Sequence, residues 1–251
     1  MQLRLVTYNI KSGLYHPDGL EAVARVLEEA DPDVVALQEV DRGTRRARNE
    51  DQTAWLAARL EMPYHCFGAA TPWDGGGEYG VGLVSDLPLV GPKVDHLWVP
   101  HGEGVGHGAR EPRVVLSATV EANGKGEALT VMVTHLGLTE EQRARQARQL
   151  LERVQEMGGR PVALAGDLNA HPDSPEVRLL AESLHDVLAH VPETERVTFP
   201  SGDPEMHGHD FLARTIDYIF VNGAAKAVEA RVIADYSLAS DHNPCEAVIA
   251  V

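Results

Sequence analysis

The sequence predicts an α/β fold in which short apolar strands alternate with amphipathic helices. Apolar runs of strand length recur along all 251 residues, with segments of helical apolar spacing between them, and polar motifs stand at several strand ends. Candidate site residues follow both the earliest and the latest strands. No repeat of roughly 20–50 residues and no Ser- or Pro-rich linker is visible. We therefore expect one domain spanning residues 1–251.

The first half of the chain predicts strands interrupted by two helices. Gln2–Tyr8 alternates and is rich in Leu and Val, which is typical of a strand. Leu20–Glu29 places apolar residues at helical spacing, and Asp31-Pro32-Asp33 ends this helix because proline cannot continue it. The other elements expected here are a strand at Val34–Leu37, a helix at Thr53–Leu60, and strands at Tyr64–Phe67, Gly80–Val84 and Leu97–Val99.

The second half predicts a hairpin, a long helix and a series of late strands. Asn123-Gly124 is a hairpin signal between strands at Val114–Val120 and Leu129–Thr134. A helix at Glu140–Met157 follows, closed by Gly158-Gly159. The remaining expected elements are a buried strand at Val162–Ala165, a short helix at Pro175–Ala181, and strands at Ile216–Val221, Val228–Ala234 and Glu246–Val251.

Three segments predict long loops, namely Thr71–Glu78, Pro100–Arg110 and Val191–Arg214. Long loops in compact domains are uncommon and often functional. We expect them to surround the site and to set substrate choice, with Pro100–Gly108 mobile when no ligand is bound.

Composition indicates a globular protein and fits a reducing compartment, with a secreted protein without disulfide bridges as the open alternative. Hydrophobic residues make up 43% and charged residues 24% of the chain, and the two cysteines, Cys66 and Cys245, make no disulfide framework. No run approaches the ~20 apolar residues that a membrane span needs. Arg4 and Asn9 interrupt any signal-peptide core, so we expect a cytoplasmic protein without a transmembrane segment.

The net charge of −16 disfavours a nonspecific nuclease, because such an enzyme must neutralise phosphates. An acidic surface also serves solubility, and the net charge of the chain does not fix the electrostatic potential in one cleft. A nuclease therefore stays open as an alternative. The one basic cluster, Arg42–Arg48, directly follows Glu39. It could hold a phosphate, or it could be a solvated loop balanced by Glu50 and Asp51.

Six polar motifs, each near the end of an apolar run, carry the strongest functional signal. A buried polar side chain is costly unless it has partners, so six such sites suggest one metal-dependent hydrolytic centre at a rim of the sheet scaffold. The motifs are Thr7-Tyr8-Asn9, Leu37-Gln38-Glu39, Thr134-His135-Leu136, Gly166-Asp167-Leu168-Asn169, Ile216-Asp217-Tyr218 and Ser240-Asp241-His242.

The carboxylates and amides of these motifs suit a hard cation and a phosphate. Glu39 ends a strand, and Mg²⁺ prefers oxygen ligands of this kind, although a lone Glu or Asn at a strand end is more often a turn residue. Asp167 and Asn169 are two apart, so in an extended chain they point the same way. One could orient water or bind metal while the other bonds a phosphate oxygen, and the competing interpretation is a simple turn.

Two histidines complete the set of candidate groups. Histidine titrates near neutrality and can act as an acid, a base or a cation. With carboxylates available at Glu78 and Asp217, His135 and His242 suggest two carboxylate–histidine pairs that fix the tautomer and raise basicity.

In their order and spacing, the six motifs resemble the endonuclease/exonuclease/phosphatase (deoxyribonuclease I-like) superfamily. The resemblance runs from Thr7 to Pro244, and its specificity lies in the whole set, since each motif alone is weak. It implies a four-layer α/β sandwich with two packed mixed β-sheets flanked by helices. It also implies a Mg²⁺ cofactor, with Mn²⁺ as a substitute.

The resemblance implies a role for each site residue. Glu39 would be the principal Mg²⁺ ligand, Asp241 would contact the metal, and Asn9 would orient the phosphate or the metal with its water shell. Arg113 is a looser match for a position near the substrate. The implied catalytic group comprises Asp167 to orient or deprotonate water, Asn169 and His242 to hold phosphate oxygens, Glu78 to pair with His135, and Asp217 to support His242.

We therefore expect a monomeric, Mg²⁺-dependent phosphodiesterase or phosphatase acting on a small or lipid-like phosphoester by in-line water attack on phosphorus. The first alternative is a nuclease of the same fold acting on DNA or RNA, which would lose affinity steeply with salt. The second alternative is a non-catalytic binding module. A zinc hydrolase is disfavoured because no histidine-rich triad has zinc spacing.

Overall fold

The computed structural model describes residues 1–73, 75–100, 110–121, 127–202, 213–235 and 237–251. The hairpin turn expected at Asn123-Gly124 and the loop motion expected at Pro100–Gly108 therefore lie outside the described residues. In the described part of the chain, no helix has both the length and the apolar character that crossing a bilayer requires.

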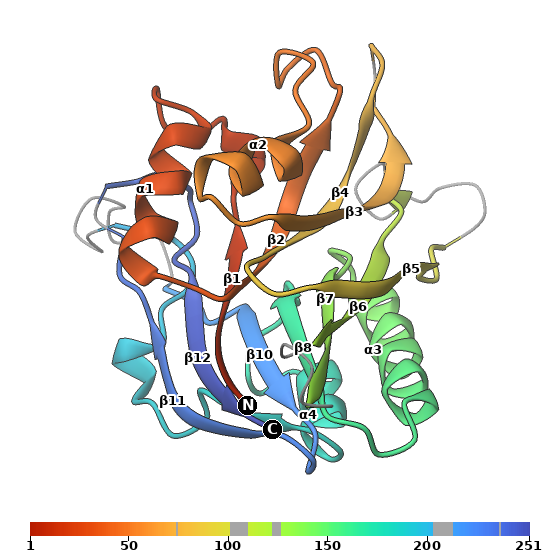
Figure 1. The fold of residues 1–251 in the computed structure, drawn as a ribbon. Coiled ribbons are helices and arrows are strands. Elements are labelled where there is room, and N and C mark those ends of the chain that lie inside the picture. The colour runs from red at the N-terminus through yellow and green to blue at the C-terminus, as the bar shows by residue number, and fades with distance from the viewer. Residues whose placement is uncertain (74, 101–109, 122–126, 203–212, 236) are drawn as a thin grey trace.

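Two mixed sheets of six strands each lie at the centre of the molecule (Figure 1). In spatial order the first sheet contains β11 (Lys226–Val232), β12 (Cys245–Ala250), β1 (Gln2–Asn9), β2 (Val34–Arg42), β4 (Glu78–Ser85) and β3 (Tyr64–Pro72). The second contains β5 (Leu89–His96), β6 (Val114–Glu121), β7 (Ala128–His135), β8 (Val162–Asp167), β10 (Asp217–Val221) and β9 (His185–Asp186).

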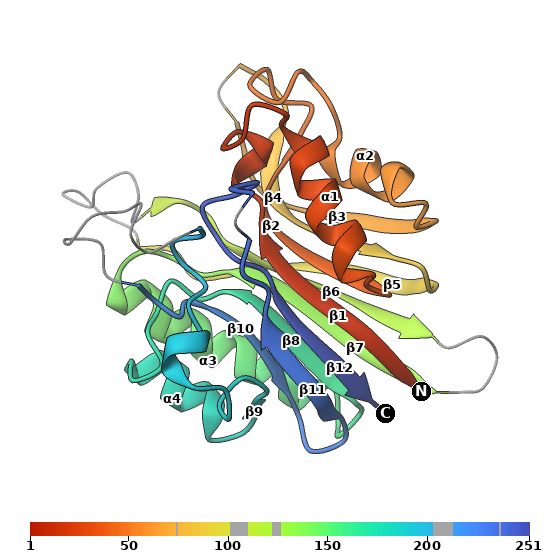
Figure 2. The ribbon, with the colours of Figure 1, turned by 90° about the vertical axis from the view of Figure 1, so that its left-hand side faces the viewer.

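Helices cover the outer face of each sheet, so the chain forms four layers (Figure 2). The helices α1 (Leu20–Ala30) and α2 (Gln52–Arg59) pack on the first sheet, and α3 (Glu140–Glu156) and α4 (Pro175–Ala181) pack on the second. Two short 3₁₀ turns lie at Lys11–Gly13 and Glu193–Glu195. The predicted four-layer sandwich of two mixed sheets flanked by helices is confirmed.

The apolar core is divided by the alternation of side chains along each strand. In β1, Leu3 and Leu5 face the second sheet, whereas Val6 and Tyr8 face the helices. Both chain ends enter this sheet, since β1 and β12 pair antiparallel and the Met1 amine donates to the Val251 carbonyl at 3.0 Å. This pairing supports the proposal of a single domain.

Strand register brings the predicted site motifs to one rim. The central pairs β1/β2 and β7/β8 are parallel, so their carboxyl ends meet at one edge of each sheet. In the second sheet, His135 of β7 lies beside Asp167 of β8, which in turn lies opposite Asp217 of the antiparallel β10. In the first sheet, Asn9 pairs with Gln38, directly before Glu39.

Helix bounds follow the predictions more closely than strand bounds do. The helix α4 has the predicted limits, and α3 begins at Glu140, where the Thr139 hydroxyl accepts from the Gln142 amide. The strand predicted at Leu97–Val99 is wrong, because the chain pairs one segment earlier, in β5. That strand lies at a sheet edge, contains Pro92 and is largely exposed, so it carries no apolar signal.

The close approach of β7 and β8 at Gly166 gives the first testable prediction. Gly166 has φ 148°, and a Cβ there would lie 2.0 Å from the Thr134 carbonyl oxygen. We expect Gly166→Ala to lower the free energy of unfolding by about 2–4 kcal/mol. The matched control is Gly158→Ala, at φ 61° with nothing within 4 Å of its Cβ, which should cost about 1 kcal/mol. Urea unfolding followed by circular dichroism measures both, and equal losses would contradict the prediction.

Candidate active site

Several residues at the rim where the motifs meet have a strained backbone. Lys11, Ser12, Glu39 and Asn169 all have positive φ, between 49° and 54°. Such values are uncommon for non-glycine residues, and each costs about 1–3 kcal/mol unless the surroundings enforce it. At Glu39 the cause is a register shift between Leu37 and Val40 in the β2/β4 pairing, and bulges of this kind re-aim side chains. The site is therefore held in a conformation that local propensity alone would not select.

Asn9 joins the two sheets. Its fully buried amide donates from Nδ2 to Glu39 Oε1 at 3.1 Å and to Asp167 Oδ2 at 3.0 Å. Its Oδ1 accepts from the Lys11 amide at 3.2 Å. Because the nitrogen faces both carboxylates, the geometry gives no support to Asn9 as a metal ligand; it supports an orienting role instead.

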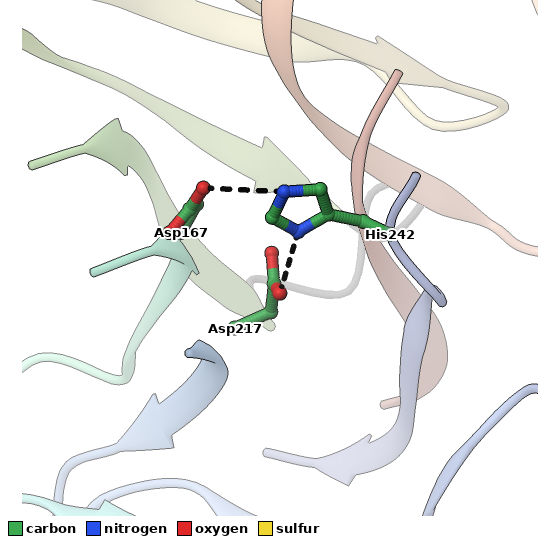
Figure 3. A group of neighbouring side chains, drawn as sticks. All are labelled: Asp167, Asp217 and His242. Atoms are coloured by element: carbon green, nitrogen blue, oxygen red, sulfur yellow. Dashed lines mark hydrogen bonds and ion pairs between the residues drawn. The ribbon is translucent and has the colours of Figure 1, made fainter. Parts of the chain in front are cut away.

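His242 lies between two buried aspartates, as Figure 3 shows. Its Nδ1 is 2.9 Å from Asp217 Oδ2, and its Nε2 is 3.8 Å from Asp167 Oδ2. The ring also lies 4.9 Å, between centroids, from that of Phe199. The structure places Asp217 in contact with His242, and the supporting role of Asp217 stays a prediction.

The protonation of this group follows from its surroundings. Burial alone lowers the pKa of His242, but the charge and hydrogen bond of Asp217, with Asp167 and Asp241 behind, raise it to about 10. Burial, with the charge of Asp217, raises the pKa of Asp167 to about 7, although His242 and bonds from Asn169 and Asn9 oppose the rise. At neutral pH the site thus holds an imidazolium beside a carboxylate that exchanges its proton readily.

His135 has different partners from those predicted. Arg113 Nη1 lies 3.0 Å from its Nδ1, and on the other side Nε2 lies 3.0 Å from Asn169 Nδ2 and 3.4 Å from Asp167 Oδ2. Burial, followed by the positive charges of Arg113, His242 and Lys11, holds the pKa of His135 well below its usual range. Two carboxylate–histidine pairs were expected, but within the part of the chain that the structure describes, of these two histidines His242 alone has a short hydrogen bond to a carboxylate.

The predicted pairing of Glu78 with His135 is wrong. Glu78 begins β4 directly opposite Arg42 of β2, and the Arg42 Nε donates to Glu78 Oε2 at 3.0 Å. Sheet register therefore gives Glu78 a partner in its own sheet. Arg113, predicted to lie near the substrate, is 4% exposed and donates to Glu111 Oε1 at 2.9 Å as well as to His135.

Glu39 and Asp241 form the oxygen-rich part of the rim. Their side chains are 17% and 15% exposed, and the Lys11 ammonium lies 3.8 Å from Glu39 Oε1 and 3.2 Å from Asp241 Oδ2. Burial alone lowers the pKa of Lys11, but these two carboxylates raise it, so the lysine stays charged. The two carboxylates thus form ion pairs with one cationic group, and their oxygens are of the type that Mg²⁺ prefers.

A second group of potential ligands, Asp167, Asp217 and His242, has donor atoms within 4.8 Å of one another. Within this group the short contact is that of His242 Nδ1 with Asp217 Oδ2, 2.9 Å apart, and Nε2 lies on the side of Asp167 Oδ2. We therefore interpret these three residues as a hydrogen-bonded triad.

Two residues that the sequence prediction did not select also shape the site. Lys11 follows Asn9 by two positions, and Ser240 directly precedes Asp241. The Ser240 hydroxyl donates to the Asn9 carbonyl at 2.6 Å and accepts from the His242 amide at 3.3 Å. Their closeness to the recognised motifs was the available signal.

The basic cluster Arg42–Arg48 is partly internal. Arg46 forms two hydrogen bonds with the fully buried Asp41, donates to the Ser12 hydroxyl at 2.9 Å, and stacks on Trp73 with its guanidinium 3.7 Å from the ring centroid. Gln52 donates to the Ser12 carbonyl at 2.6 Å. These contacts fix the strained turn that presents Lys11.

Together the fold and the site define an α/β sandwich protein with a buried carboxylate–histidine network at one rim of its two sheets. The chain belongs to the Endonuclease/Exonuclease/phosphatase family, whose sequence model matches residues 6–242.

Solved structures of similar fold agree with this family. An endonuclease/exonuclease/phosphatase from Beutenbergia cavernae DSM 12333 is 26% identical with a TM-score of 0.75, covering 100% of this chain and 72% of its own. The mannosyl-6-phosphatase of Bacteroides thetaiotaomicron VPI-5482 is 18% identical with a TM-score of 0.73, and the match covers 99% of this chain and 100% of that chain. The human Nocturnin catalytic domain with bound sulfate is 20% identical with a TM-score of 0.73, and the match covers 99% of this chain and 93% of that chain. The last two similarities concern the fold alone.

The Asp217–His242 pair predicts a specific pH dependence of stability. The pKa of His242 is raised from about 6.5 in the unfolded chain to about 10 in the folded protein. Its contribution to the free energy of unfolding is therefore complete below about pH 6.5 and is lost as the pH rises through about 10. Asp217→Asn should therefore lower the free energy of unfolding by about 3 kcal/mol near pH 6, and by progressively less toward pH 10.

Urea unfolding across this pH range in the presence of EDTA measures the effect. The matched control is Asp186→Asn, which breaks a similarly buried pair with Arg196 at 2.8 Å. Because arginine stays charged throughout, the loss in this variant should not change with pH. Parallel curves for the two variants would contradict the assignment.

Proposed function

We propose that this protein is a metal-dependent phosphoester hydrolase that uses in-line attack of water on phosphorus. The observation that carries the proposal is the position of Asp167. It is 2% exposed, fixed by Asn9, flanked by both histidines, and has a pKa near neutrality. A carboxylate of this kind can accept a proton from water at neutral pH.

The surrounding residues have complementary roles in this proposal. Asp167 orients and deprotonates the attacking water. The His242 imidazolium, held by Asp217, stabilises negative charge on a phosphoryl oxygen, and Asn169 holds the phosphate through its amide. Asn9 fixes Asp167 relative to Glu39 and so keeps the base and the metal-binding rim in one geometry.

Glu39 and Asp241 would hold the metal ion. Their carboxylate oxygens match the hard-cation preference of Mg²⁺, with Mn²⁺ as a substitute, and the Lys11 contact indicates that a cation fits between them. When bound, the ion supplies charge stabilisation for the phosphoryl oxygens. Glu78 is bonded to Arg42, which favours a structural role over the catalytic one predicted.

A small or lipid-like phosphoester is the favoured substrate. Arg42 and Arg46, half of the arginines of the basic cluster, are occupied by Glu78 and Asp41, which leaves less charge for a polyanion. The net charge of −16 acts in the same direction. The similar fold of a mannosyl-6-phosphatase supports a small phosphate ester. Monomeric state and cytoplasmic location remain proposals from the sequence.

Hydrolysis of model esters tests the proposal. We expect wild type to cleave bis-p-nitrophenyl phosphate or p-nitrophenyl phosphate with Mg²⁺ or Mn²⁺ and not with EDTA. Asp167→Asn should lower kcat about 10²–10⁴-fold, because it removes the base while keeping the shape. Glu39→Gln should weaken metal activation. The control is Asp33→Asn, which also converts a carboxylate to an amide but lies directly before β2, and this variant should keep full activity.

The same assay separates the alternatives. Strong plasmid nicking at low salt that falls steeply as salt rises would favour the nuclease. A folded wild-type protein that turns over no phosphoester would favour the binding module. Turnover that survives in Glu39→Gln without any change in metal dependence would contradict the metal assignment.

A further inference from the structure

Arg113 lies behind His135 as seen from the site. It precedes β6, is 4% exposed, and directs Nη1 at His135 Nδ1, 3.0 Å away, and at Glu111 Oε1, 2.9 Å away. The cavity beside it, bounded by Tyr79 and His135 among others, measures only about 10 Å³, which admits at most one water molecule. Among the described residues, Arg113 therefore contacts the rim through the imidazole of His135.

The guanidinium restricts the protonation of that imidazole. It carries five N–H donors and no acceptor, so a nitrogen facing it at hydrogen-bond distance must accept. The imidazolium and the Nδ1–H tautomer would both set an N–H group against an N–H group. Only the neutral form with the proton on Nε2 satisfies the contact.

The contact with Asn169 is the weaker constraint. Its Nδ2 lies 3.0 Å from both His135 Nε2 and the Leu136 carbonyl oxygen, and a half-turn of the amide presents the oxygen to Nε2 at the cost of the Leu136 bond and of a contact between two oxygens. A guanidinium has no such alternative orientation. Arg113, rather than Asn169, thus decides the tautomer.

The charges around His135 act in the same direction. Arg113, His242 and Lys11 all disfavour a further positive charge there, and burial adds to them. The carboxylate of Asp167, 3.4 Å away, lies at Nε2 and favours a proton on that nitrogen. Tyr79 of β4 bonds to Arg113. The Glu78 carboxylate is bonded to Arg42, so it does not face His135 Nδ1.

We propose that Arg113 is a positioning residue that locks His135 as its neutral Nε2–H tautomer. His135 is then a hydrogen-bond donor toward Asp167 and a bound phosphoryl oxygen, and not a general base. The two histidines thus have opposite protonation states, His135 neutral and His242 charged. The part concerning the phosphoryl oxygen rests on the proposed function, whereas the tautomer does not.

Two-bond ¹H–¹⁵N correlation spectra of ¹⁵N-histidine-labelled protein test the tautomer directly, with His135→Gln providing the assignment. We expect an unprotonated Nδ1 and a protonated Nε2 in wild type from about pH 5 to about pH 8. Arg113→Met should lose this preference and shift the titration of the ring toward about 6.5. Arg113→Lys should keep part of it, because an ammonium also carries only donors.

Kinetics separate positioning from direct binding and from simple stability. We expect Arg113→Met to lower kcat about 10²-fold with KM nearly unchanged, and Arg113→Lys to recover part of the loss. Arg143→Met removes another mostly buried arginine, paired with Glu176, and should lower stability without moving kcat or the His135 signals.

Three results would overturn the inference. The first is an imidazolium or an Nδ1–H ring at His135 in wild type near neutral pH. The second is a raised KM with unchanged kcat in Arg113→Met, which would make Arg113 a substrate ligand. The third is an unchanged tautomer in folded Arg113→Met. If wild type hydrolyses no phosphoester, the proposed function fails, while the spectra still decide the tautomer.

Discussion

The hydrogen bonds of Asn9 are the interaction on which the site depends. One buried amide joins Glu39 in the first sheet to Asp167 in the second. Glu39 lies within β2 and Asp167 ends β8, and these strands belong to different sheets, so the packing of the two sheets brings the carboxylates together. The apolar core between the sheets therefore sets the separation of the proposed metal ligand Glu39 from the proposed base Asp167.

From this arrangement follows the electrostatic asymmetry of the site. Asp217 favours a positive charge on His242, while burial and Arg113 disfavour one on His135, although the Nε2 atoms of both rings lie near the same oxygen, Asp167 Oδ2. The two histidines thus differ in protonation because Asp217 contacts His242 and Arg113 contacts His135. Asp167, in contact with both, acquires a pKa suited to proton exchange at neutral pH.

The four-layer arrangement was implied by the resemblance of the motif set to a known family, whereas the elements and the site motifs came from local pattern. Local pattern identified β1 by its apolar alternation, α1 by helical apolar spacing, the end of α3 by Gly158-Gly159, and Asp167 by its place after an apolar run. It did not predict the partner of Glu78, because that follows from the register between β2 and β4, which a bulge shifts. Lys11 was missed for a similar reason, since its position comes from a strained turn held by distant Arg46 and Gln52.

The local charge balance reconciles an acidic protein with an anionic substrate. The Lys11 ammonium faces the carboxylates of Glu39 and Asp241, and the His242 imidazolium faces Asp217, so these cations offset much of the carboxylate charge at the rim of a chain that carries −16. A divalent ion held by Glu39 and Asp241 would offset the rest and make the rim favourable to a phosphoryl group. The strongly negative remainder of the molecule would still repel long polyanions. The same charge distribution therefore favours metal dependence and a compact substrate together, and the two properties should be gained or lost as one.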